Sequence, residues 1–231
     1  MSKILVTGSA GLIGRQIVKD LIEESLDVYS CYNKSMPEFG IPTHFDLTKK
    51  ERIIEIFQTI KPDIVIHLAA ITDVEKCEIQ RKQAFIINSN STKILAREAA
   101  KHKAFFVYIS TDYVFDGKIG MKDEDDIPNP LNFYGKTKLD GEIAVKELTK
   151  NYAIIRTSTP FGLHQTKKSF PLWVKENLEF KKEISVLIDQ FTSPTYVPNL
   201  SKMIIEVALK QITGIIHLAG STRLSRYELA N

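Results

Sequence analysis

Tyr134 and Lys138 stand four residues apart in the segment Tyr134-Gly-Lys-Thr-Lys138, and this spacing places both side chains on one face of a helix. A tyrosine with the reference pKa of about 10 exchanges protons poorly near neutral pH, and a nearby ammonium favours the phenolate. The pair could therefore protonate a carbonyl oxygen while a hydride reaches the carbonyl carbon. The spacing alone is weak, because a chain with 8 tyrosines and abundant lysine holds such a pair by chance on the order of once.

A second group of polar residues follows the apolar run Phe105–Ile109, which predicts a buried strand. Ligands of parallel α/β sheets bind beyond the carboxyl ends of the strands, so we expect Ser110, Thr111 and Tyr113 to face a substrate. A hydroxyl beside the carbonyl oxygen can donate a hydrogen bond as negative charge develops there, and it can orient the phenol. The alternative interpretation is an ordinary Ser/Thr turn at the end of a strand.

The residues from Thr7 to Gly14 read Thr-Gly-Ser-Ala-Gly-Leu-Ile-Gly and lie between a predicted strand at 3–7 and an amphipathic helix that begins at Leu12. Glycines at 8, 11 and 14 allow a tight turn and a close approach of the backbone to a pyrophosphate. The N–H groups of Leu12, Ile13 and Gly14 would then hold the phosphates at the helix N-terminus. The three glycines are a weak pattern alone, but their position between strand and helix predicts a dinucleotide site that includes Gly8, Gly11 and Gly14.

The end of the second predicted strand indicates which dinucleotide binds. An Asp or Glu about 20 residues beyond the glycines usually binds the ribose of NAD, and the sequence Cys31-Tyr-Asn-Lys34 contains no acid. Asn33, Lys34 and Ser35 could instead bind a 2′-phosphate, and Arg15 adds a positive charge nearby. The alternative is that Lys34 is a solvated loop lysine. We therefore predict NADP(H) as the preferred cofactor, with NAD(H) as the second choice.

Strands and helices alternate along the chain at a spacing that predicts an α/β fold, a Rossmann-type doubly wound parallel sheet. The expected strands are 3–7, 27–32, 42–45, 63–68, 104–110, 152–156, 185–188 and 214–218. The expected helices, besides the one that begins at Leu12, are 49–60, 75–101 with a break near Cys77–Arg81, 134–150, 169–180 and 196–211.

Taken together, these motifs resemble the extended short-chain dehydrogenase/reductases and, within them, the dTDP-4-dehydrorhamnose reductase (RmlD-like) family. The matching segments keep their order over nearly the whole chain. They are Val6–Gly14, Asp46-Leu47, His67-Leu-Ala-Ala70, Asn88 with Thr92, Ser110–Gly117, Tyr134–Lys138, Arg156-Thr-Ser158 and Ser193-Pro-Thr195.

The resemblance implies roles for individual residues. Thr111, Tyr134 and Lys138 would be the catalytic residues, and Thr111, Tyr113 and Tyr134 would contact the sugar. On the cofactor side, Asp46 and Leu47 would border the adenine, Ala69 and Ala70 would border the ribose and the nicotinamide, and Tyr134 and Lys138 would also contact the cofactor.

The chain departs from the family pattern in two places. The reductases usually place a tryptophan after the Arg-Thr-Ser segment, against the sugar, where this chain has Thr159-Pro160. Family members also run on for tens of residues beyond residue 231. We therefore expect a Rossmann domain over 1–157 and a small, truncated substrate lobe over 158–231, interleaved with returning strands near 185–188 and 214–218.

Composition excludes several classes of function. The balance of 31 basic and 28 acidic residues gives a net charge of +3, too mild to indicate nucleic acid. No apolar run reaches membrane-spanning length, and two cysteines suit a reducing compartment, so we expect a cytoplasmic protein with no membrane partner. His67 and His217 lie in predicted strands, where we expect core or sheet-end residues. No histidines have metal-ligand spacing, so we expect no metal. The acidic run Asp123–Asp126 is interpreted as a solvated shoulder of a loop.

Three functions remain open on the sequence. The first is an NAD(P)H-dependent oxidoreductase that reduces a nucleotide-linked 4-keto-6-deoxy sugar, with dTDP-4-dehydrorhamnose as the best single substrate; its assembly could be a homodimer. Sugar-nucleotide dehydratases follow the catalytic threonine with Asp-Glu, whereas Thr111 is followed by Asp112-Tyr113, which argues against water elimination. The second is a nucleotide-sugar epimerase. The third is a non-catalytic NADP-binding subunit similar to the β subunit of methionine adenosyltransferase, since fold does not fix function.

Overall fold

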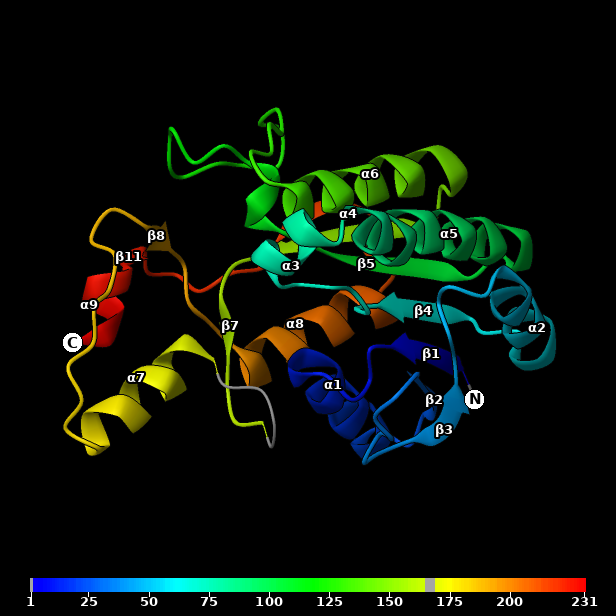
Figure 1. Ribbon diagram of the computed structural model, residues 1–231. Helices are drawn as coiled ribbons and strands as arrows, with labels where there is room; N and C mark the ends of the chain where they lie inside the picture. Colours follow the sequence, from blue (N-terminus) through cyan, green and yellow to red (C-terminus); the bar gives the residue numbers. More distant parts are fainter. Residues whose placement is uncertain (1, 165–168) are drawn as a thin grey trace.

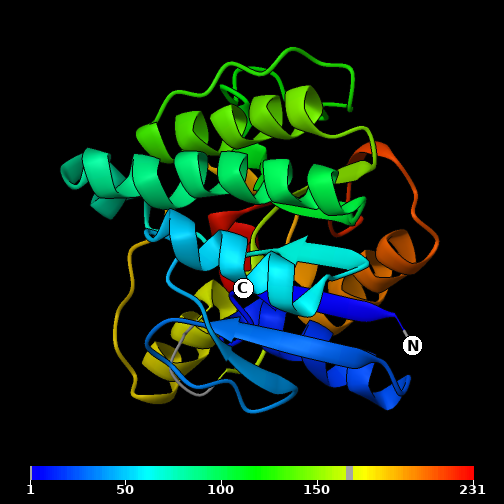
Figure 2. The same ribbon diagram turned by 90° about the vertical axis from the view of Figure 1, so that its right-hand side faces the viewer.

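The computed structural model describes residues 2–164 and 169–231, and a seven-stranded parallel sheet forms the centre of the fold (Figures 1 and 2). The strands of this sheet are β1 Lys3–Thr7, β2 Asp27–Tyr32, β3 Ile41–His44, β4 Ile64–His67, β5 Phe105–Thr111, β6 Tyr152–Thr157 and β10 Gly214–His217. Their spatial order is β10-β6-β5-β4-β1-β2-β3. The order reverses at β1, so a crevice forms between the carboxyl ends of β1 and β4, where ligands of such sheets bind.

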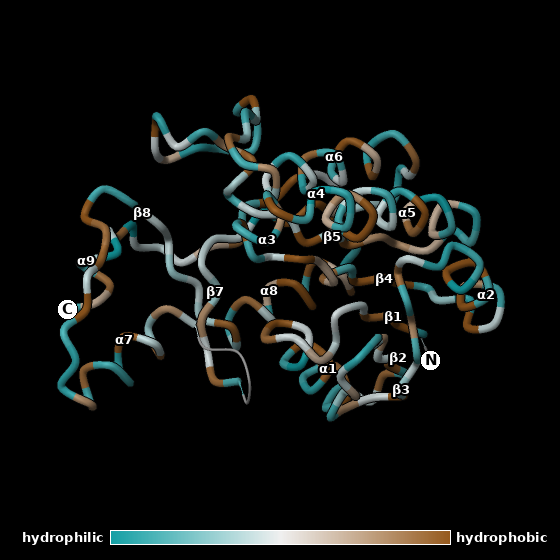
Figure 3. Tube along the Cα trace, in the orientation of Figure 1, coloured by the Kyte–Doolittle hydropathy of each residue, from teal (hydrophilic) through white to brown (hydrophobic). Residues whose placement is uncertain are grey.

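Helices cover both faces of this sheet, which confirms the predicted doubly wound fold (Figure 1). On one face lie α1 (Leu12–Glu23) and α8 (Val197–Leu209); on the other lie α2 (Lys50–Ile60), α5 (Ser91–His102) and α6 (Phe133–Leu148). Side chains alternate along β1, so Ile4 and Val6 pack with α1 and α8 while Leu5 packs with α2 and α5. Because both faces are buried, the strands are continuous apolar runs, and β1 and β4 are largely brown in Figure 3.

The segment predicted as a helix over 75–101 with a break near Cys77–Arg81 is confirmed as a series of shorter helices. They are α3 (Val74–Ile79), α4 (Arg81–Ala84), the π-helical η1 (Phe85–Asn90) and α5. Asp73 caps the first of them by accepting the N–H of Lys76 at 2.9 Å. The break falls at Gln80, whose φ of −110° and ψ of 50° lie outside the helical region. The other predicted helices agree with the structure within a few residues at their ends.

A small lobe follows β6, and it contains two short sheets and two helices. The sheets pair β7 (Pro160–Phe161) with β9 (Thr195–Tyr196) and β8 (Phe191–Thr192) with β11 (Leu224–Ser225); the helices are α7 (Phe170–Glu179) and α9 (Arg226–Ala230). The predicted strand at 214–218 is confirmed as β10, which pairs with β6 and returns the chain to the main sheet.

The strand predicted at 185–188 is wrong, because these residues have irregular structure. Apolar residues in this run suggested a buried strand, but Leu187 and Ile188 are 59% and 73% exposed. Within the described residues no strand pairs with the run. A strand needs a neighbour for its backbone hydrogen bonds, and the sequence run by itself does not supply one.

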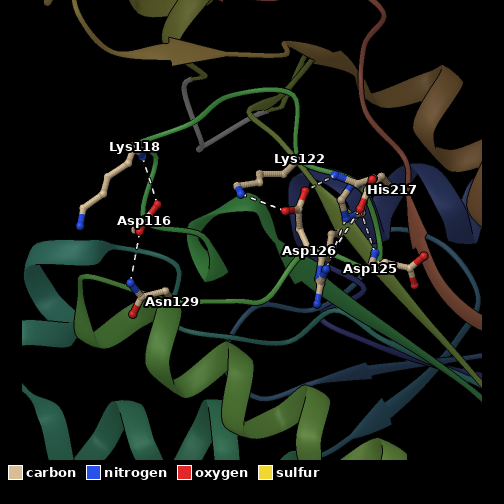
Figure 4. A network of polar contacts seen from close by, with 9 residues as sticks. Asp116, Lys118, Lys122, Asp125, Asp126, Asn129 and His217 are labelled. Atoms are coloured by element: carbon tan, nitrogen blue, oxygen red, sulfur yellow. Dashed lines mark hydrogen bonds and ion pairs between the residues drawn. The ribbon is translucent and has the colours of Figure 1, made fainter.

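The acidic loop before α6 lies at the edge of the main sheet (Figure 4). Lys122 Nζ donates to Asp126 Oδ1 at 3.0 Å, and Asp123 Oδ1 accepts the N–H of Asp126 at 3.1 Å. Glu124 Oε1 accepts the backbone N–H of His217 on β10 at 2.7 Å. The interpretation of a purely solvated acidic run is therefore wrong for Glu124, which satisfies a polar group of the edge strand and fixes the loop to the sheet.

Gly141 on α6 gives a test of this packing. A Cβ at this position would overlap the hydroxyl of Tyr108 and lie 2.7 Å from its Cζ, in a part of the core with little space to yield. We expect Gly141→Ala to lower the free energy of unfolding by about 1–3 kcal/mol, measured by urea denaturation. Gly120→Ala is the matched control, because the nearest atom to a Cβ there is Arg223 Nε at 3.5 Å. Equal stability of the two variants would contradict the packing described here.

Candidate active site

A cavity of about 820 Å³ lies beyond the carboxyl ends of β1, β4 and β5 and extends to the lobe. Every residue that the sequence predicted for the cofactor, the substrate or catalysis lines this cavity. These residues are Gly8, Gly11, Leu12, Ile13, Gly14, Asn33, Lys34, Asp46, Leu47, Ala69, Ala70, Thr111, Tyr113, Tyr134 and Lys138. The parallel sheet brings these distant segments together because each follows, or packs beside, the carboxyl end of a strand.

The turn after β1 is too tight for side chains. Gly8 has a φ of +70°, and a Cβ there would lie 2.9 Å from the backbone N of Ala69. A Cβ on Gly14 would overlap the carbonyl oxygen of Gly8, so only glycine allows α1 to begin directly over the turn. Gly11 caps α1 without any side-chain hydrogen bond, and the first turn of the helix has no acid. The N–H groups of the first turn of α1 fit the pyrophosphate of a dinucleotide.

The part of the cavity that follows β2 and β3 is lined by Asn33, Lys34, Ser35 and Asp46. Asp46 is turned toward its own loop, where it accepts the N–H and the hydroxyl of Thr48 at 2.9 and 2.8 Å. The positive charge expected from Arg15 is already used, because Arg15 forms a bidentate ion pair with Glu38 at 2.7 and 3.0 Å.

Tyr134 is buried at the start of α6, with 8% of its surface exposed. Burial is the main cause that raises the pKa of its phenol well above the usual value, and a hydrogen bond with Thr111 opposes that rise. The ring of Tyr113 packs edge-on against it, with the ring centres 5.8 Å apart. The phenol therefore keeps its proton at neutral pH, which suits a general acid rather than a base.

Lys138 is buried one turn further along the same helix face. Its Nζ lies 4.1 Å from the centre of the Tyr108 ring, a cation–π contact. Burial lowers the pKa of the Lys138 ammonium to about 7, and the charge of Glu142 opposes this shift. The sequence predicted that Lys138 would lower the pKa of Tyr134; in the structure burial outweighs any such effect on the phenol.

Ser110 lines the cavity, but its hydroxyl bonds to a buried carboxylate. Its hydroxyl donates to Glu142 Oε1 at 2.6 Å, inside the protein. Glu142 is also the partner of Arg156, whose Nε and Nη2 donate to the carboxylate at 3.0 and 2.8 Å. Both charged side chains are buried, so this bidentate pair holds α6 against β6 and carries a large cost if one partner is removed.

A second buried polar network connects the glycine turn to α6 through His67. Thr92 donates its hydroxyl proton to the carbonyl of Asn88 at 2.7 Å, so His67 Nε2 carries the proton that bridges to Thr92 at 3.0 Å. His67 Nδ1 then accepts the hydroxyl of Thr7 at 2.7 Å. Asn88 in turn donates to Thr137 at 3.1 Å. The expectation that His67 is a core residue is confirmed, and the ring is neutral.

Sequence reasoning missed part of the cavity wall in the lobe. Ser169, Phe170 and Arg226 of the lobe line the cavity, and Thr159 and Pro160 line it as well. The guanidinium of Arg226 lies 4.8 Å from the centre of the Phe170 ring, and its Nε donates to Gln190 at 3.2 Å. The only signal in the sequence was the capping box that starts α9, which shows where a helix begins but not which cavity it faces.

The described residues contain no cluster of His, Cys, Asp or Glu that could hold a metal ion. Among the same residues, no helix is both long and apolar enough to cross a membrane.

The chain is 32% identical over 240 residues to a dTDP-4-dehydrorhamnose reductase of Aggregatibacter actinomycetemcomitans, covering 100% of this chain and 77% of the relative. It is 33% identical to the methionine adenosyltransferase 2 subunit beta of Xenopus tropicalis, covering 98% and 70%. The crystal structure of the Bacillus anthracis dTDP-4-dehydrorhamnose reductase in complex with NADP is similar, with a TM-score of 0.90, 34% identity, and coverage of 100% and 79%.

The parallel sheet, the glycine turn and these similarities define an extended short-chain dehydrogenase/reductase, the Rossmann-fold class of NAD(P)H-dependent oxidoreductases. Within that class, the chain belongs to the family of the RmlD substrate binding domain, whose model matches residues 2–231.

Burial of His67 makes the free energy of unfolding depend on pH. Burial lowers the pKa of His67 from 6.5 to about 3, so protonation between these values favours the unfolded chain. Stability is therefore complete above the unfolded pKa and is lost as the pH falls below it, by up to about 1.4 kcal/mol per pH unit. We expect urea midpoints to fall between about pH 7 and about pH 5, and to fall much less in His67→Gln. An equal slope in the variant would contradict a neutral buried His67.

Proposed function

We propose that this protein reduces a nucleotide-linked 4-keto-6-deoxy sugar with NADPH, and that dTDP-4-dehydrorhamnose is the first substrate to test. The observation that carries the proposal is the position of Tyr134, a buried and protonated phenol beside Thr111, in the cavity that contains the glycine turn. Reduction of a ketone needs one hydride and one proton, and Tyr134 can supply the proton. The dTDP-4-dehydrorhamnose reductases among the relatives support this substrate class.

The cofactor is NADP(H), and NAD(H) is the alternative. No acid stands at the end of β2, and Lys34 lies in the cavity wall where a 2′-phosphate would bind. The glycine turn and the uncapped N-terminus of α1 provide the N–H groups that bind the pyrophosphate. When bound, the nicotinamide supplies the hydride.

Three residues of the chain would perform the proton transfer. Tyr134 would donate its phenol proton to the carbonyl oxygen of the sugar, and Thr111 would hold the phenol in position. Lys138 lies one helical turn away on the same face, where its ammonium would stabilise the phenolate that remains. Burial of all three side chains excludes water and strengthens these electrostatic interactions.

The residue after Asp112 supports reduction rather than dehydration. Dehydratases need a second acid or base at this position for the removal of water. Tyr113 occupies it, and its ring packs on the catalytic phenol. The site therefore has an aromatic wall where elimination would need a carboxylate.

Tyr134→Phe tests the proton donor. We expect turnover to fall by about 10²–10⁴-fold because only the hydroxyl is lost, while the dissociation constant of NADPH stays within about twofold of the wild type. The measurement is the loss of NADPH absorbance with enzymatically prepared dTDP-4-dehydrorhamnose, combined with calorimetric titration of NADPH. Turnover retained in this variant would contradict the role of Tyr134.

Arg226 provides a second test, at the substrate side of the cavity. Three cations line the described cavity wall: Lys34 at the adenosine end, Lys138 beside Tyr134, and Arg226 in the lobe. A nucleotide sugar carries a diphosphate, which Arg226 would bind. We expect Arg226→Gln to raise KM for the sugar nucleotide about tenfold or more, with little change in kcat or in NADPH affinity. A lower kcat at unchanged KM would contradict this role.

A second function is favoured by one comparison. The similarity to the methionine adenosyltransferase 2 subunit beta is as close as the similarity to the reductases. In that alternative the cavity binds NADP(H) without turnover and the chain serves a partner protein. Tight NADPH binding, no oxidation with the sugar nucleotide, and co-purification with a methionine adenosyltransferase would together favour it.

A further inference from the structure

The hydroxyl of Thr111 has only one proton to donate, and in the structure Asp112 accepts it. Thr111 Oγ1 donates to Asp112 Oδ1 at 3.1 Å and accepts the N–H of Tyr113 at 3.2 Å. A carboxylate can only accept, so the direction of the first bond is fixed while Asp112 is ionised. Thr111 then meets Tyr134 as an acceptor.

Asp112 is also the end point of a chain of hydroxyls from the lobe. Ser158 Oγ donates to Asp112 Oδ2 at 2.6 Å, so the contact of Ser158 with Thr192 at 2.8 Å requires Thr192 to donate. Thr192 has then used its proton, and the hydroxyl of Thr159 must donate to it. In this row of hydroxyls, each residue donates its proton to the next residue on the way to Asp112. Thr159 lines the cavity, so the chain runs from the lobe side of the cavity wall to the catalytic threonine.

We propose that Asp112 is a positioning residue that holds the hydroxyl of Thr111 as an acceptor for Tyr134 and so keeps the phenol protonated until a carbonyl oxygen takes its proton. When Tyr134 has given up its proton, the O–H of Thr111 turns from the Asp112 carboxylate to the new phenolate. The covalent O–H bond of Thr111 stays intact during this rotation, because its proton only changes the hydrogen-bond acceptor. This inference rests on the proposed function, in which Tyr134 gives its proton to the carbonyl oxygen of a ketone.

The charges around Tyr134 agree with this role. The groups that raise the pKa of its phenol, besides burial, are Asp112 and Tyr113 on η2 (Asp112–Val114) and Cys77 on α3. A hydrogen bond with Thr111 lowers that pKa. Asp112 therefore favours the protonated phenol of Tyr134 in two ways. Its negative charge raises the pKa of the phenol, and its hydrogen bond with Thr111 engages the proton that would otherwise stabilise the phenolate. Burial raises the pKa of Asp112 itself, while the bonds from Ser158 and Thr111 lower it and favour its ionised form.

The test replaces Asp112 with asparagine, which removes the charge and keeps the shape. We expect the titration midpoint of Tyr134, followed by NMR of protein with 13C-labelled tyrosine and bound NADP⁺, to fall by about one pH unit or more. Tyr134→Phe assigns the resonance. With the sugar nucleotide, the alkaline limb of the kcat profile should move to lower pH by a similar amount, because reduction needs the protonated phenol, while KM stays nearly constant.

Ser158→Ala is the second variant and covers the case in which Asp112→Asn does not fold. Loss of the Ser158 bond raises the pKa of Asp112, so the pH profile of the Tyr134 resonance should show the titration of the neighbouring Asp112 carboxyl at a higher pH. Asp20→Asn is the matched control: its carboxylate accepts the hydroxyl of Ser201 at 2.6 Å, between α1 and α8 and outside the cavity wall, so we expect no change in either profile.

The outcomes separate this inference from the proposed function. The NMR titration needs no turnover, so it decides the role of Asp112 even if the sugar nucleotide is not reduced. A failure of wild-type turnover alone would count only against the proposed reaction. If Tyr134 behaves identically over the whole titration in the wild type and in Asp112→Asn, or if folded Ser158→Ala changes only thermal stability, Asp112 has a merely structural role and the inference is overturned.

Discussion

Exclusion of water from one face of α6 is the constraint on which the active site depends. The helix packs this face against the sheet, so Tyr134 and Lys138 lose their hydration together. Desolvation raises the pKa of the Tyr134 phenol and lowers the pKa of the Lys138 ammonium. Both shifts favour the neutral form of the side chain, because burial penalises charge of either sign. The phenol keeps its proton, and the lysine titrates near neutrality. The proton of Tyr134 is thus retained because of packing, before any ligand contact is considered.

Three buried networks keep that helix face in position. Glu142 and Arg156 connect α6 to β6, and His67 connects the glycine turn to the helix through threonine and asparagine side chains. Asp112 collects the hydroxyls that join the lobe to the threonine beside the phenol. Each network satisfies its polar groups internally, which is the condition for burying them without a large loss of stability. The polar interior and the positions of Tyr134 and Lys138 therefore depend on each other.

Much of the fold could be predicted, because its signals are local. A strand, a glycine turn and an amphipathic helix occupy neighbouring positions in the chain, and the glycine at position 14 is required by a contact only six residues away. The strand predicted at 185–188 failed because pairing is not a local property. Glu124 was interpreted as solvated for the same reason, since its partner on β10 lies 93 residues further along the chain.

The sequence by itself determined the class of fold, the turn suited to a pyrophosphate, and the types of residue available for proton transfer, since these follow from spacing along a helix or a strand. Only the tertiary structure decided how those residues are used. It buried Tyr134 deeply enough to raise the pKa of its phenol, and it paired the hydroxyl of Ser110 with the carboxylate of Glu142. It also placed Arg226 in the cavity wall. The physical reason is that desolvation and hydrogen-bond direction depend on neighbours far away in the chain, and periodicity carries no information about them.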